Sequence, residues 1–131
     1  MAFISPALIA RIYQALGQNR GSDAILLLRQ HSFDDKPLPD AELIRAIVRL
    51  ADERYYSANV RCAEDHFKLG LALYECCFTH AHVEALRCVT GLMNIYSEQK
   101  RLSEMSALIE QAENICAKLD QRYRAPKAIA V

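Results

Sequence analysis

Apolar residues recur every three or four positions along most of the chain, which is the spacing of one face of an α-helix. The strongest such pattern lies between Leu102 and Leu119. Sustained alternation of apolar and polar residues, the pattern of a half-buried strand, is absent, and so are the Asn-Gly and Asp-Gly pairs of tight hairpins. The pattern therefore predicts an all-α fold of about six helices.

Prolines, glycines and capping residues predict where these helices begin and end. Ser5 followed by Pro6 is a typical start, and Gly17 is a typical stop. The second helix is expected to start at residue 22 or 23. Four further helices are expected at residues 40–56, 60–77, 79–98 and 102–119. One clear loop is expected at residues 31–40, where two prolines exclude a helix.

Short connections between these segments favour antiparallel neighbours, so the six helices are expected to form three α-hairpins. The apolar residues of the segment at 60–77 lie on more than one side, which predicts a central helix. One helical domain over residues 1–119 accounts for the pattern. Polarity rises after this domain and Pro126 follows, so residues 120–131 are expected to form a flexible C-terminal tail.

Within residues 86–119, five apolar residues follow one another at intervals of four, nine, four and three. They are Leu92, Tyr96, Met105, Ile109 and Ala112. These intervals resemble the signature of the tetratricopeptide repeat, a 34-residue helix–turn–helix unit. Its signature residues lie where the two helices of a hairpin touch. Separately from the resemblance, Leu108 and Ile109 lie at the centre of the last apolar stripe, so we expect both to be buried against the preceding helix.

The match to the tetratricopeptide signature is incomplete, and a second segment of the chain also resembles part of a repeat. Met93 and Lys100 stand where the family prefers glycine. The segment LGLALYE at 69–75 also resembles the first helix of a repeat, and its second helix would then contain Leu86, which the window at 86–119 places in a first helix. Either one match is accidental or the hairpins are irregular, and an irregular helical bundle is the alternative architecture.

The tetratricopeptide resemblance implies a scaffold that binds a partner protein or peptide in a helical groove, as an adaptor, chaperone or regulator. Tyr55, Tyr56 and Tyr96 are candidate groove residues because tyrosine is favoured at interfaces, and half-buried hairpin positions are the structural alternative. Arg45 and Arg49 lie on one side of their helix and are candidate contacts for an acidic partner. A solvated, partly ion-paired face is the simpler interpretation of these arginines.

The segment YECCFTHAHVEAL contains four side chains suited to zinc, copper or nickel, namely Cys76, Cys77, His80 and His82. A metal- or thiol-based sensor is therefore the alternative function. No regular conformation aims all four inward, and the CxxC spacing is missing. The simpler hypothesis is a joint between two helices, in which Thr79 caps the second helix and both histidines face solvent.

Composition narrows the function classes. The 131 residues are 52% apolar, and 16 basic residues balance 16 acidic ones, so general attraction to nucleic acid or anionic lipid is not expected. This balance, without a clear helix-turn-helix, weighs against a DNA-binding regulator. No apolar run is long enough for a membrane span, and five cysteines without a secretory signal favour a reducing, cytoplasmic protein.

No catalytic or phosphate-binding motif occurs in the chain, and nothing implies a cofactor. We therefore expect a non-enzymatic module that interacts with another protein or peptide. The first two helices are rich in apolar residues, which leaves a homodimer open as well.

Overall fold

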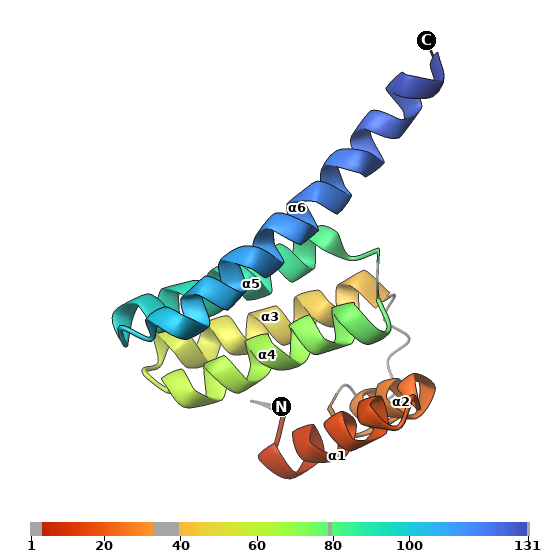
Figure 1. Ribbon diagram of the computed structural model, residues 1–131. Coiled ribbons are helices and arrows are strands. Elements are labelled where there is room, and N and C mark those ends of the chain that lie inside the picture. Colours follow the sequence, from red (N-terminus) through yellow and green to blue (C-terminus); the bar gives the residue numbers. More distant parts are fainter. Residues whose placement is uncertain (1–3, 33–39, 79, 131) are drawn as a thin grey trace.

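Six α-helices make up the part of the chain that the computed structural model describes, residues 4–32, 40–78 and 80–130. No β-strand occurs among these residues, and the predicted all-α fold is confirmed (Figure 1). The predicted loop at 31–40 lies mostly in residues 33–39, outside the described residues. The helices are α1 (Pro6–Gly17), α2 (Gly21–Ser32), α3 (Asp40–Tyr56), α4 (Val60–Cys76), α5 (His82–Glu98) and α6 (Leu102–Ala130).

The same tight turn joins α1 to α2, α3 to α4 and α5 to α6. In each turn one residue has a left-handed backbone: Asn19 (φ 57°), Ala58 (φ 65°) and Lys100 (φ 56°). The amide of the next residue then bonds to a carbonyl five residues back, which is the closing bond of a Schellman motif. These bonds join Arg20 to Ala15 (2.8 Å), Asn59 to Arg54 (2.8 Å) and Arg101 to Tyr96 (2.9 Å). Three hairpins therefore reverse direction by one mechanism.

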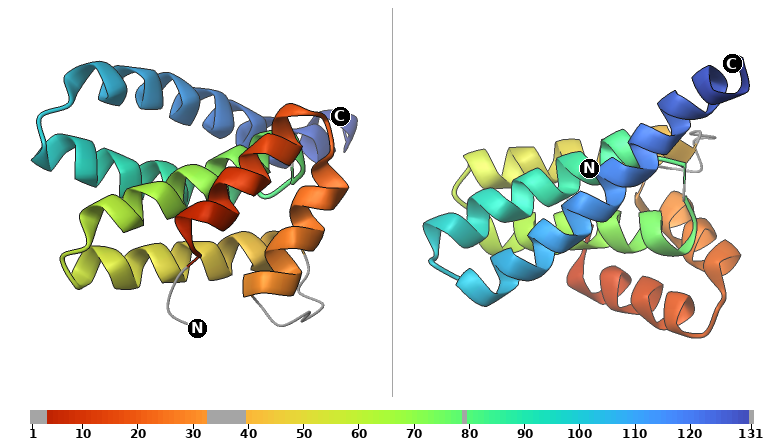
Figure 2. Two further views of the ribbon diagram at one scale, coloured as in Figure 1. Left: turned by 90° about the horizontal axis from the view of Figure 1, so that it is seen from below. Right: turned by 45° about the horizontal axis from the view of Figure 1, so that its top comes forward.

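Helix α4 occupies the centre of the molecule, as its apolar pattern predicted. It packs against both α3 and α5, while α5 also contacts α3 and α6. The α1–α2 hairpin lies on the side of α4 that faces away from α6 (Figures 1 and 2). The backbone N–H of Ile4, just before α1, donates to Nε2 of His66 on α4 at 2.9 Å and ties this hairpin to the centre.

Two glycines let the central helices approach closely. A Cβ added to Gly91 of α5 would lie 2.4 Å from the ring of Phe67 on α4, and one added to Gly70 of α4 would lie 2.7 Å from Sγ of Cys88 on α5. Phe67 and Cys88 are almost completely buried. At both points of the α4–α5 contact, a side chain of one helix therefore fills the space that a glycine leaves on the other.

Helix α6 has 29 residues and α5 has 17, and the C-terminal end of α6 projects beyond the other helices (Figure 1). The prediction that this helix ends near Leu119, with Pro126 as its limit, was wrong. Alanine, arginine, lysine and glutamine, which favour helix, dominate residues 120–130. A proline inside a helix removes one backbone hydrogen bond, and α6 continues through it. The predicted flexibility of this tail stays a prediction.

Candidate functional site

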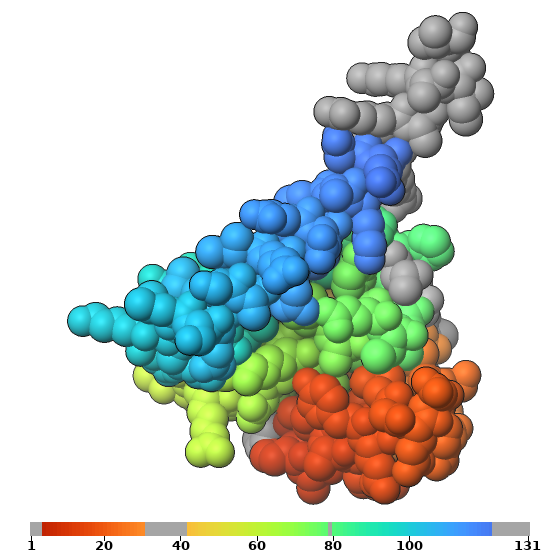
Figure 3. Space-filling view, viewed as in Figure 1, coloured from red at the N-terminus to blue at the C-terminus, as the bar shows by residue number. Residues whose placement is uncertain are grey.

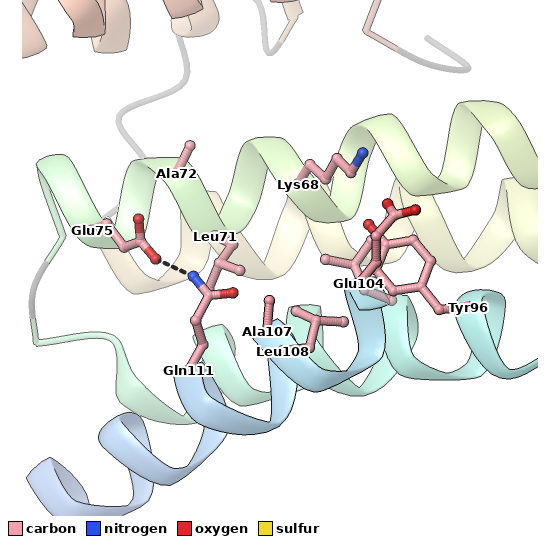
Figure 4. A pocket seen from close by; sticks show the side chains of 10 residues that line it. Lys68, Leu71, Ala72, Glu75, Tyr96, Glu104, Ala107, Leu108 and Gln111 are labelled. Atoms are coloured by element: carbon pink, nitrogen blue, oxygen red, sulfur yellow. Dashed lines mark hydrogen bonds between the residues drawn. The ribbon is translucent and has the colours of Figure 1, made fainter. Parts of the chain in front are cut away.

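A groove runs between α4 and α6, with α5 as its floor (Figure 4). Leu71, Leu92 and Leu108 supply its apolar lining, around a cavity of about 290 Å³. A second cavity of about 280 Å³ continues along the same two helices. Between them, Nε2 of Gln111 donates to Oε1 of Glu75 at 2.7 Å and bridges the groove. The groove is thus divided into two hollows.

The charged groups at one end of this groove bind one another. Arg101 donates to Oε1 and Oε2 of Glu64 at 2.7 and 3.0 Å and also pairs with Glu104. The Lys68 ammonium lies 2.7 Å from Glu64 Oε2. Hydrogen bonds from Arg101 hold the pKa of Glu64 below its ordinary value, so this mostly buried carboxyl stays ionised. These ion pairs therefore stabilise the fold.

Tyr96, a predicted partner-contact residue, forms part of the groove floor and is only 3% exposed. The guanidinium of Arg101 lies over its ring, 4.4 Å from the centroid. The segment at 69–75 lies in α4, the second helix of the α3–α4 hairpin, and the tetratricopeptide resemblance stays a prediction.

Helices α3 and α5 are joined by polar contacts that include two of the predicted site residues. Nε of Arg45 lies 3.0 Å from Oε1 of the buried Glu84, and the hydroxyl of Tyr55 donates to Glu98. Tyr56 packs edge-on against Tyr55, with ring centroids 5.5 Å apart, and is 83% exposed. Arg49 is exposed on the same helix. A binding role for these four residues stays a prediction.

The cysteine–histidine segment forms the joint between α4 and α5. Cys76 is exposed at the end of α4, and Cys77 is its C-terminal cap. His80 is exposed, whereas His82 is buried, with its Nδ1 2.7 Å from the hydroxyl of Tyr74. Among the described residues, no three histidine, cysteine or acidic side chains are grouped so that they would hold a metal ion.

Two predictions about this joint were wrong. Helix α5 begins at His82 with Ala81 as its N-cap, and no side chain caps it, whereas the sequence predicted a start at Thr79, which lies outside the described residues. His82 was expected to face solvent. Its burial has a physical reason, because Tyr74 on α4 supplies the hydrogen bond that a buried imidazole needs.

The two histidines should therefore differ in their effect on stability. His82→Ala removes the partner of the buried Tyr74 hydroxyl and is expected to lower the free energy of unfolding by about 1–3 kcal/mol. His80→Ala, at an exposed position, should change it by less than about 0.5 kcal/mol. Urea denaturation of both variants measures this difference, and equal midpoints would contradict the burial of His82.

His66 is a buried polar residue that the sequence analysis did not single out. Its Nε2 accepts from the amide of Ile4, and its Nδ1 lies 2.8 Å from the carbonyl oxygen of Cys62. Since Nε2 accepts, Nδ1 carries the proton and donates, which describes a neutral imidazole. Burial lowers the pKa of His66 below its ordinary value. The sequence contains no signal that distinguishes a buried, hydrogen-bonded histidine of this kind from an exposed histidine.

Acid should weaken the attachment of the α1–α2 hairpin through His66. Its folded-state pKa is lowered, so its contribution is present above the ordinary pKa of about 6.5 and is lost as the pH falls from there toward the folded value. His66→Gln removes this titration. Over that pH window the native protein should lose more stability than the variant in chemical denaturation, and equal slopes would contradict the assignment.

Helix α6 carries an apolar stripe that is only partly covered. We define the α6 stripe as Leu102, Met105, Ile109, Ala112, Cys116 and Leu119, which follow one another at alternating intervals of three and four. Leu102 is 71% exposed and Ile109 43%, whereas Leu108, on the side toward α5, is 4% exposed. The predicted burial of Leu108 is confirmed, and that of Ile109 was wrong, because α5 covers only one side of the apolar face.

Comparison with known proteins adds no relative: no family model, curated protein or solved structure matches this chain. No helix among the described residues is long and apolar enough to cross a membrane.

Proposed function

We propose that this protein is a non-enzymatic protein–protein interaction module, and that it binds its partner through the α6 stripe. The observation that carries the proposal is the exposure of Leu102 and Ile109 in the α6 stripe. Exposed apolar residues that form a row, rather than scattered single residues, are typical of a recognition surface. A row at helical spacing suits a partner helix laid along it.

The shape and chemistry of the α6 stripe favour protein over a small ligand. From Leu102 to Leu119 the stripe is about 25 Å long, at 1.5 Å per helical residue. Helix α6 forms a ridge that crosses the molecule in the space-filling view (Figure 3). By contrast, the α4–α6 groove is divided by the Gln111–Glu75 hydrogen bond and has charged groups that already bind one another. An adaptor, chaperone or regulator in the cytoplasm is the role that this surface suits.

Affinity purification from cells that express the protein naturally tests the proposal. Native protein is compared with Leu102→Asp, which places a charge in the stripe, and with Gln30→Asp, which places the same charge at an exposed position on α2. We expect a partner that is retained by native protein and by Gln30→Asp and is lost from Leu102→Asp. Retention by all three forms would place the binding surface elsewhere.

A further inference from the structure

Three residues of the α6 stripe stand at the positions that, on α4, contact α5. The left-handed residues Ala58 and Lys100 mark the same point in two identical turns, so residues can be counted from each. The ninth, twelfth and sixteenth residues after Ala58 are Phe67, Gly70 and Tyr74. The corresponding residues after Lys100 are Ile109, Ala112 and Cys116, all of them in the α6 stripe.

On α4, those three positions contact α5. Phe67 fills the space above Gly91, Gly70 lies against Cys88, and Tyr74 bonds to His82. A bulky apolar residue followed by a small one thus forms the surface on which the next helix packs. Ile109 and Ala112 repeat that order on α6. Among the described residues, no helix follows α6 to cover them.

Acidic residues border the α6 stripe on its solvent side. The exposed residues along this border, at helical spacing from the stripe, are Ser103, Ser106, Glu110, Glu113, Ala117 and Asp120. They include three carboxylates and no lysine or arginine. Glu110 and Glu113 form no ion pair with any described residue. The border therefore presents negative charge to whatever lies on the stripe.

We infer that the α6 stripe receives an amphipathic helix of a partner protein, packed as α5 packs on α4, whose apolar side is bordered by lysine or arginine. The inference rests on the proposed function and adds the chemistry of the partner. Five turns, or about 18 residues, match the length of the stripe. Contact between apolar stripes supplies the affinity, and the charges at the border select the partner.

The charge pattern distinguishes this occupant from a second copy of the same chain. Two α6 stripes packed antiparallel would bring the borders with Glu110 and Glu113 close to one another. Like charges held at a helix interface are destabilising. A partner helix bordered by basic residues forms ion pairs at the same places.

Two designed helical peptides of about 18 residues test the inference. Both carry leucine and alanine at the intervals of the α6 stripe, one with lysine at the border and the other with glutamate. Fluorescence anisotropy measures their binding to native protein, to Leu102→Asp and to the charge-reversed Glu110→Lys/Glu113→Lys variant. Circular dichroism checks that each variant remains helical.

We expect the lysine peptide to bind native protein, with salt weakening it, and to lose binding to Leu102→Asp. Charge reversal should weaken the lysine peptide by about tenfold at low salt and improve the glutamate peptide. Equal binding of both peptides, or binding of neither, would overturn the inference. So would a dimer, seen by analytical ultracentrifugation, that Leu102→Asp dissociates.

Failure of the inference and failure of the proposed function give different results. If neither peptide binds but affinity purification still yields a partner that Leu102→Asp loses, the interaction module stands and the basic helical partner is wrong. If no partner depends on Leu102, the proposed function itself fails.

Discussion

Replacing Phe67 with alanine is expected to lower the free energy of unfolding by about 3–5 kcal/mol. Its side chain is 2% exposed and fills the space above Gly91, where α4 and α5 meet. Because α4 also packs on α3, a cavity at this position affects the contact on which the other helices depend. Urea denaturation followed by circular dichroism measures the loss.

The glycine opposite gives a second, linked result. Gly91→Ala places a Cβ 2.4 Å from the Phe67 ring, so overpacking should cost about 1–3 kcal/mol, partly offset by about 1 kcal/mol of better helix propensity. Combining Gly91→Ala with Phe67→Leu should recover part of the loss, because the smaller side chain makes room. Strictly additive effects of the two changes would show that these helices do not meet at this pair.

Two neighbouring residues on α6 should respond very differently to truncation. Leu108→Ala is expected to lower the free energy of unfolding by about 2–5 kcal/mol, because Leu108 is buried in the contact between α5 and α6. Ile109→Ala should cost about 1 kcal/mol or less, because 43% of its side chain is exposed and alanine is the better helix former.

The same pair separates a structural face from a binding face. If the α6 stripe is a binding surface, Ile109→Ala should weaken partner binding more than it weakens folding, and Leu108→Ala should do the reverse. Paired measurements of unfolding and of peptide affinity check this. A large folding loss at Ile109 would show that the free protein buries the whole stripe.

Much of the fold follows from signals that lie close together in the chain. Ser5 and Pro6 mark the start of α1, and its first turn is closed as expected, with the Ser5 hydroxyl accepting from the amide of Leu8. The starts of α3, α4 and α6 and the end of α5 also agree with the caps and the apolar periodicity. The predicted end of α6 was wrong because residues that favour helix continue after the apolar stripe ends.

The candidate site depends on contacts between distant segments, and these explain the remaining errors. Periodicity shows that α6 has an apolar face, but only the position of α5 shows that Leu108 is covered and Ile109 is not. Likewise, the local sequence predicts that His82 is exposed, and only the position of Tyr74 on α4 shows that it is buried. The three matching turns contain asparagine, alanine and lysine in the left-handed position, so no glycine marked the repetition in the sequence.

If the α6 stripe is the binding surface, a partner protein lies directly on it. Photo-crosslinking in living cells tests it, with a benzophenone amino acid placed at Ile109 or, as a control, at Gln30 of α2. We expect one discrete adduct with another protein from the Ile109 position and none from Gln30. An absence of adduct at Ile109, or the same adducts from both positions, would contradict it.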